Sequence, residues 1–389
     1  METPSIIERS FQGWKMWLGI SIGVFVAAWM LYSSISATRF IEAENGKGSY
    51  RWEDKNHNQY VDLADTKEFI YDTNGTYRKQ TVSDALRLIH WTPTSFLWIL
   101  VALLCVVGRD FFYMLRIRLL THNELTWKAS FYVIMLWEFA SALSPGVVGG
   151  VAVAMFILNK EKIDLGRSTA IVLITAMMDN LFYVLMIPFV FLFIDSATLF
   201  PSHSFGSSSV QFIFWTGFFV FLGLTLFLFT SLFILPSFAK RILGFVFSLP
   251  FLNRRKEKVT AIGDNIEKTA LLMRKEPFSF WVKVFLATCG SWISRYLVIN
   301  ALLQAFLQLG LLDHIVLLGK QLVLWLLMRV SPTPGGSGIA EYAFGELLVD
   351  FSQSALLLAS LAIVWRLMSY FPYLFIGAFL LPRWLKRRS

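Results

Sequence analysis

Long apolar stretches, separated by shorter polar segments, recur along most of the chain. Each is long enough to cross or deeply enter the hydrocarbon core of a membrane, which is roughly 30 Å thick. Backbone in lipid must satisfy its own hydrogen bonds, so such stretches are expected to be helices. The pattern therefore predicts an all-α polytopic membrane protein. The predicted membrane segments are 17–36, 94–120, 127–158, 167–194, 210–236, 278–309, 315–350 and 351–381.

Two of these segments are interrupted in the middle by proline and glycine. The first break, at 141–150, reads S-A-L-S-P-G-V-V-G-G, and the second, at 331–338, reads S-P-T-P-G-G-S-G. Proline lacks an N–H and glycine lets the backbone turn sharply, so a helix is expected to end at each break. The arms on either side are shorter than the about 20 residues of a full crossing. We therefore predict re-entrant hairpins at 127–158 and 315–350, with ordinary loops as the alternative.

Composition and charge agree with a membrane protein and orient it. The chain is 56% hydrophobic with a formal net charge of +9, and an excess of basic residues in short loops marks the cytoplasmic side. This rule places both termini in the cytoplasm. The predicted regions are an N-terminal membrane anchor helix (1–37), an extracytoplasmic insert (38–92), a first membrane half (93–236), a basic cytoplasmic segment (237–277) and a second membrane half (278–389).

The two membrane halves have the same order of elements but opposite directions. Each reads as a span, a hairpin and a span, and the first hairpin enters from the inside whereas the second enters from the outside. This is an inverted-topology repeat, an arrangement in which transporters place their substrate site near the membrane midplane. The basic segment between the halves is explained by the positive-inside rule, and a surface helix on anionic lipid is the alternative.

The insert contains a run of oxygen-bearing side chains with the rhythm of a calcium loop. Calcium prefers hard oxygen ligands, and the spacing resembles the loops of EF-hands and dockerins. The run departs from that pattern at Gln59, where glycine is expected. A solvated turn rich in Asp and Asn is the alternative interpretation. The candidate ligands are Asp54, Asn56, Asn58, Tyr60, Asp62 and Asp65.

Several charged residues fall inside the apolar segments. Such residues usually face a bundle interior or a wet cavity, because a charge at mid-bilayer costs several kcal/mol. Arginine suits phosphate because its planar fork binds two oxygens. Asp110, Lys320 and Glu346 are interpreted as structural, and structural ion pairs are the alternative for all of these charges. The candidate lipid-binding residues are Arg109, Asp179, Arg295, Arg329, Glu341 and Arg366, with Pro145, Gly149, Gly150, Pro334, Gly335, Gly336 and Gly338 at the breaks.

The sequence contains no recognisable catalytic constellation. The histidines lie in loops or near segment ends without metal-ligand spacing, and there is no nucleophile elbow or phosphate-binding loop. Cys105 and Cys289 both fall inside apolar segments and are interpreted as small core residues. We therefore expect a protein that is not an enzyme and requires no cofactor, with calcium in the insert as the one metal that the sequence suggests.

The stretch S-P-T-P-G-G-S-G-I-A-E-Y, Ser331 to Tyr342, carries a family resemblance. It resembles the P-x-P-G-G-x-G-x-x-E signature of the lysylphosphatidylglycerol synthase transmembrane-region family, also called flippase-like integral membrane proteins. The resemblance covers the chain from about Thr94 onward. Full-length synthases carry a soluble aminoacyl-transferase domain after the membrane region, and this sequence ends at Ser389. The resemblance therefore implies translocation without aminoacylation.

These observations favour a lipid translocator of the bacterial inner membrane. Its partners are expected to be membrane lipids and no nucleic acid, with an anionic phospholipid or a polyprenyl-phosphate-type lipid as substrate. Helix N-termini near Gly150 and Gly338 are expected to offer free N–H groups to phosphate. Two alternatives remain: a non-transporting scaffold or accessory subunit of an envelope lipid or glycan enzyme, and a small-solute secondary transporter.

Overall fold

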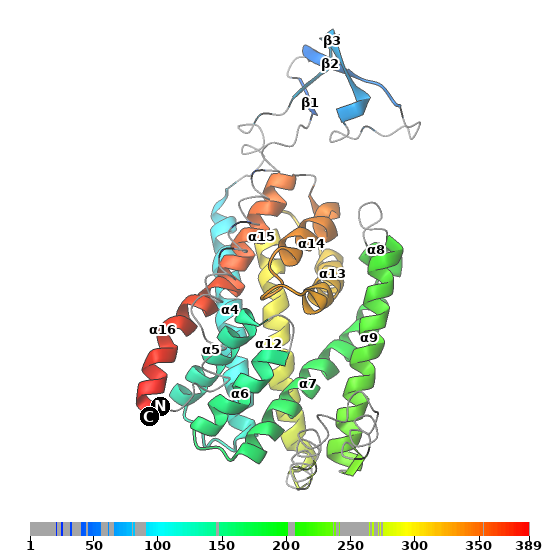
Figure 1. Cartoon of the computed structure of the whole chain (residues 1–389). Coiled ribbons are helices and arrows are strands. Elements are labelled where there is room, and N and C mark those ends of the chain that lie inside the picture. The colour runs from blue at the N-terminus through cyan, green and yellow to red at the C-terminus, as the bar shows by residue number, and fades with distance from the viewer. Residues whose placement is uncertain are drawn as a thin grey trace, which may run out of the picture.

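A computed structural model describes residues 40–43, 46–55, 66–79, 91–144, 148–200, 207–235, 275–352 and 354–388, with a few isolated positions between them. The membrane part is helical (Figure 1). The predicted anchor at 1–37 and most of the basic segment at 237–277 lie outside the described residues. Within the described residues, six helices are long and apolar enough to cross a membrane: Pro93–Leu120, Leu165–Phe191, Val210–Ile234, Phe278–Gln304, Leu311–Val330 and Leu356–Lys386.

Two long helices, α4 (Pro93–Leu120) and α12 (Phe278–Gln304), pack against each other through small residues. A Cβ on Gly290 would lie 2.7 Å from the Phe112 ring, and one on Gly108 would lie 3.3 Å from Ser294 Oγ. Small residues let membrane helices approach closely, which increases van der Waals contact between their backbones. This close pair carries charged residues of both membrane halves.

The first broken segment forms two helices, α5 (Trp127–Leu143) and α6 (Val148–Lys160). Thr126 caps α5 by accepting a hydrogen bond from the N–H of Ala129 at 3.2 Å. The pair packs tightly, because a Cβ on Gly150 would lie 2.2 Å from Ser141 Oγ. The chain continues through α7 (Leu165–Phe191), the short α8 (Ser196–Leu199) and α9 (Ser207–Phe229), which ends in a π-helical turn, Thr230–Ile234.

The second broken segment forms α13 (Leu311–Val330) and α14 (Ile339–Leu348), followed by a 3-10 turn at Val349–Phe351. Figure 1 shows α5 and α6 in the lower half of the bundle and α13 and α14 in the upper half. The expectation that both arms of this segment are short is wrong for α13. It has 20 residues and is long enough to cross a membrane, whereas α14 has 10 residues.

The last predicted span, 351–381, is divided into α15 (Ala355–Ser369) and α16 (Phe371–Arg388). Tyr370 separates them with φ −128° and ψ −60°. Pro372 is the cause that the sequence provides, because its nitrogen has no hydrogen to donate to the preceding turn. The break brings Tyr370 against the end of α5 and the loop between α13 and α14.

The insert contains a small sheet that the helical pattern did not predict. Its antiparallel strands are β1 (Phe40–Glu42), β2 (Gly48–Trp52), β3 (Phe69–Gly75) and β4 (Tyr77–Lys79), in the order β1-β4-β2-β3. Phe40 stacks on Phe69 with ring centroids 4.1 Å apart, which gives the sheet an aromatic core. Figure 1 places it beyond the end of the helical bundle where α15 begins. Of the six candidate calcium ligands only Asp54 is described; Asn56, Asn58, Tyr60, Asp62 and Asp65 lie outside the described residues.

Candidate functional site

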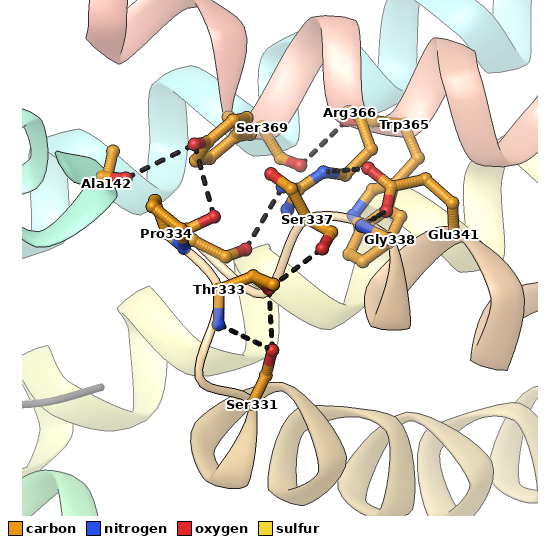
Figure 2. Close-up of polar contacts among 12 residues, drawn as sticks. Ala142, Ser331, Thr333, Pro334, Ser337, Gly338, Glu341, Trp365, Arg366 and Ser369 are labelled. Carbon is orange, nitrogen blue, oxygen red and sulfur yellow. Dashed lines mark hydrogen bonds and ion pairs between the residues drawn. The ribbon is translucent and has the colours of Figure 1, made fainter. Parts of the chain in front are cut away.

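The loop between α13 and α14 folds into a compact turn with its own hydrogen bonds. Thr333 Oγ1 donates to the carbonyl of Ser337 at 2.8 Å and lies 2.7 Å from Ser331 Oγ (Figure 2). Gly335 and Gly336 have φ values of +58° and +68°, a region that side chains with a Cβ rarely adopt. The glycines therefore provide a reversal that a helix cannot make, as their sequence pattern predicted.

Glu341 and Arg366 form an ion pair that binds this loop. Arg366 Nε lies 2.9 Å from Glu341 Oε1, and both side chains are almost fully buried (Figure 2). Arg366 also donates to the carbonyl of Gly335 at 3.0 Å and to Ser337 Oγ at 3.2 Å. The second carboxylate oxygen, Oε2, accepts the N–H of Gly338 at 2.6 Å. The pair thus fastens the start of α14 and the loop to α15.

This capping corrects one expectation about the site. The N–H of Gly338 is not free for phosphate, because Glu341 already binds it and places a negative charge at the N-terminus of α14. At the first break, Gly149 and Gly150 fall in the opening turn of α6, where Gly150 serves the close contact with Ser141. Pro145 lies outside the described residues. The N–H of Gly338 is therefore not part of the anion site that the sequence suggested, whereas the expectation for the helix start near Gly150 stays a prediction.

Tyr370 connects the two broken helix pairs. Its hydroxyl lies 3.2 Å from the carbonyl oxygen of Ala142, at the end of α5, and 3.4 Å from that of Pro334, in the second loop. The guanidinium of Arg366 lies over the Tyr370 ring at 3.9 Å. A Cβ on Gly335 would come within 2.0 Å of the same ring. The ends of the two pairs therefore meet at the break between α15 and α16.

A cavity of about 250 Å³ opens beside this meeting point. Helices α4, α5, α6, α7, α12 and α13 contribute its walls, together with the glycine loop. The predicted residues Asp179, Arg295, Arg329, Gly335 and Gly336 line it. The other predicted residues that the structure describes are not among those that line it. The polar and aromatic lining residues are Tyr113, Arg116, Trp137, Glu138, Ser141, Ser144, Thr175, Asp179, Trp292, Arg295, Trp325 and Arg329.

Asp179 on α7 is held by two donors. Arg116 Nη1 lies 2.5 Å from its Oδ1, and Trp292 Nε1 donates to the same oxygen at 2.8 Å. Arg116 also reaches Thr288 Oγ1 at 3.3 Å. Arg116 lies near the end of α4 and of the predicted span 94–120. Its side chain is buried in the cavity wall and neutralises Asp179.

Glu138 on α5 lies between two arginines of the central helices. It forms an ion pair with Arg109 of α4, and Arg295 Nη2 of α12 lies 3.8 Å from its Oε2. Arg109 is buried behind the wall, with its guanidinium over the rings of Tyr113 at 5.4 Å and Tyr373 at 4.7 Å. The candidate Arg109 therefore acts on the cavity through Glu138, a residue that was not among the predicted site residues.

Two arginines in the cavity retain unused capacity for an anion. Among the described residues no carboxylate lies within ion-pair distance of Arg329; its guanidinium lies over Trp325 at 4.4 Å and Phe221 at 5.3 Å. Arg295 lies over Trp292 at 4.9 Å, and its Nε has no hydrogen-bond partner in the described part of the chain. Three arginines and two carboxylates line the cavity, so one positive charge is in excess. Such a cavity is suited to an anion.

The contacts of Lys320 fit the alternative interpretation, in which a charge inside the membrane belongs to a structural ion pair. It is 1% exposed and its Nζ lies 2.6 Å from Asp350 Oδ2, away from the cavity. Asp110 likewise accepts the Tyr373 hydroxyl at 2.9 Å. Both contacts fit the interpretation of these residues as structural, because a buried charge or polar group requires a partner.

The fold and the cavity define the class of protein: a polytopic helical membrane protein whose broken helices meet beside an arginine-lined cavity. The chain belongs to the family described as the lysylphosphatidylglycerol synthase transmembrane region, which it matches over residues 77–377. It is also similar to a UPF0104 membrane protein of Archaeoglobus fulgidus, with 28% identity over 295 residues, covering 73% of this chain and 85% of the relative. No solved structure matches it.

Proposed function

We propose that this protein moves a lipid with an anionic, phosphate-bearing head-group across the inner membrane of a bacterium. The observation that carries this proposal is the cavity of about 250 Å³ lined by Arg295 and Arg329, in which three arginines face two carboxylates. A charged cavity inside an apolar bundle costs free energy unless an occupant or water uses it. Membership of a membrane family named for a lipid synthase agrees with a lipid as that occupant.

The proposed topology is an inverted repeat with re-entrant hairpins and both termini in the cytoplasm. It is supported by the position of the α5–α6 and α13–α14 pairs in opposite halves of the bundle (Figure 1). The contacts of Tyr370 with Ala142 and Pro334 join the ends of these pairs. In this arrangement the cavity lies near mid-membrane, where a head-group would pass while its acyl chains remain in lipid.

No chemical conversion is part of the proposal. The head-group would be held by the guanidinium groups of Arg295 and Arg329, with Gly335 and Gly336 as the adjacent wall. Glu341 and Arg366 would keep the loop in place. No cofactor is required for this role. Calcium in the insert stays a prediction, and it would contribute to stability outside the membrane and not to transport.

The direct test is lipid movement in proteoliposomes that contain fluorescent phosphatidylglycerol. Arg295→Ala and Arg329→Ala are expected to slow the movement by roughly 10- to 100-fold, because a hydrogen bond to a charged group contributes about 1.5–3 kcal/mol. Arg383→Ala, on an exposed position of α16, is the matched control and should behave as wild type. Wild-type rates in both cavity variants would refute the site. A wild-type protein that moves no lipid would refute the function and favour the scaffold alternative.

A further inference from the structure

The two arginines with unused donors are each supported by a tryptophan. Trp292 and Arg295 lie three residues apart on α12, and Trp325 and Arg329 lie four residues apart on α13. These spacings place each pair on one face of its helix. The guanidinium carbons lie 4.9 Å and 4.4 Å from the ring centroids. A ring face attracts the cation without occupying the in-plane N–H donors that bind phosphate oxygens.

The two tryptophans also contact each other. Their ring centroids are 5.1 Å apart at an interplanar angle of 87°, an edge-to-face arrangement. Phe182 stacks against Trp292, and Tyr183 packs against Trp325 at 4.5 Å. The rings that carry the arginines are therefore fixed by their neighbours, which restricts the positions of both guanidinium groups.

Trp292 has a second role that Trp325 lacks. Its indole N–H donates to Asp179 Oδ1, the oxygen that also binds Arg116. These two donors, one on α4 and one on α12, restrain the carboxylate. Without the indole N–H, Asp179 would be freer to turn into the cavity and neutralise another arginine. The Trp325 N–H has no hydrogen-bond partner among the described residues, and its ring face contacts Arg329.

We infer that Trp292 and Trp325 are positioning residues that keep Arg295 and Arg329 available for the head-group, and that they thereby set a preference for anionic over zwitterionic lipids. This inference rests on the proposed function, because it concerns the same cavity. Trp325 acts through its ring face alone. Trp292 acts through its ring face and through the hydrogen bond that restrains Asp179.

The different roles predict different results for conservative variants. Binding of dioctanoyl-phosphatidylglycerol and dioctanoyl-phosphatidylcholine to the full chain in a neutral maltoside detergent gives the ratio of the two dissociation constants. Trp325→Leu should weaken phosphatidylglycerol binding by roughly 3- to 30-fold, since a cation–π contact contributes about 0.5–2 kcal/mol. Trp325→Phe should restore it. Trp292→Phe keeps a ring but loses the N–H, so it should still reduce the preference by roughly 10-fold.

The controls separate positioning from stability. Trp281→Phe changes a tryptophan of α12 that packs against Phe233 and Phe280, away from the cavity, and should leave both dissociation constants unchanged. An unchanged lipid preference in both Trp292→Phe and Trp325→Leu would overturn the inference. Equal weakening for both lipids together with a lower melting temperature would also overturn it. If the wild-type protein has no preference for phosphatidylglycerol, the proposed function itself fails.

Discussion

Substituting Arg366 should reduce the stability of the fold itself, independently of any direct effect on a ligand. The side chain is 2% exposed and pairs with Glu341, which is 1% exposed. In Arg366→Ala the loop loses the ion pair, the hydrogen bonds to Gly335 and Ser337, and the contact with the Tyr370 ring. The carboxylate of Glu341 would remain buried, with the N–H of Gly338 as its remaining partner.

The magnitude follows from leaving that charge without its partner. Breaking a buried ion pair by removing one member typically costs about 3–5 kcal/mol. This is a large part of the about 5–15 kcal/mol that stabilises a typical folded protein. At about 2 °C for each kcal/mol in a chain of this size, the melting temperature should fall on the order of 5–10 °C.

Intrinsic fluorescence during heating in detergent provides the measurement, because the chain contains 14 tryptophans. The double variant Glu341→Gln/Arg366→Met removes both charges, and Gln can still accept the N–H at the start of α14. It should be more stable than the sum of the single effects by about 1–3 kcal/mol. Arg383→Ala is the exposed control. Strict additivity, or a melting temperature of Arg366→Ala equal to wild type, would refute the reasoning.

Three further predictions concern the stability of the helical bundle and are tested by the same thermal measurement. Gly335→Ala should be strongly destabilising, because its φ is +58° and its Cβ would lie 2.0 Å from the Tyr370 ring; a wild-type melting temperature would contradict that geometry. Tyr370→Phe should cost about 1 kcal/mol by removing the hydroxyl contact with Ala142, while the ring remains. Asp350→Asn should destabilise more than Lys320→Met, because it leaves a buried ammonium without its carboxylate; the reverse order would show that the pair is dispensable.

The sequence was sufficient for the helices and for the two breaks. Apolar length located the long helices within a few residues, because helices in lipid must be long and apolar. The proline and glycine clusters located the loops before α6 and α14. Pro372 was also visible in the sequence, and it marked the division of the last span at Tyr370 that the apolar pattern concealed.

The composition of the cavity was only partly predictable. Arg295, Arg329 and Asp179 were identified as charges at membrane depth, but partners that meet through tertiary packing were not. Arg116 and Asp179 lie 63 positions apart in the chain, so no local pattern connects them. The spacing of Tyr113 with Arg116, like that of Trp292 with Arg295, was a local signal for arginines supported by rings. The sheet of the insert was missed because its strands have only three to seven residues.

The capping of α14 by Glu341 distinguishes two parts of the site. The backbone of the loop is fixed, whereas the side chains around the cavity can vary. The backbone of the glycine loop is bound internally and to Arg366, so its conformation does not depend on what occupies the cavity. The charged side chains that line the cavity come from the surrounding helices and not from the loop. Substitutions among those side chains can therefore change the charge and shape of the cavity without altering the loop.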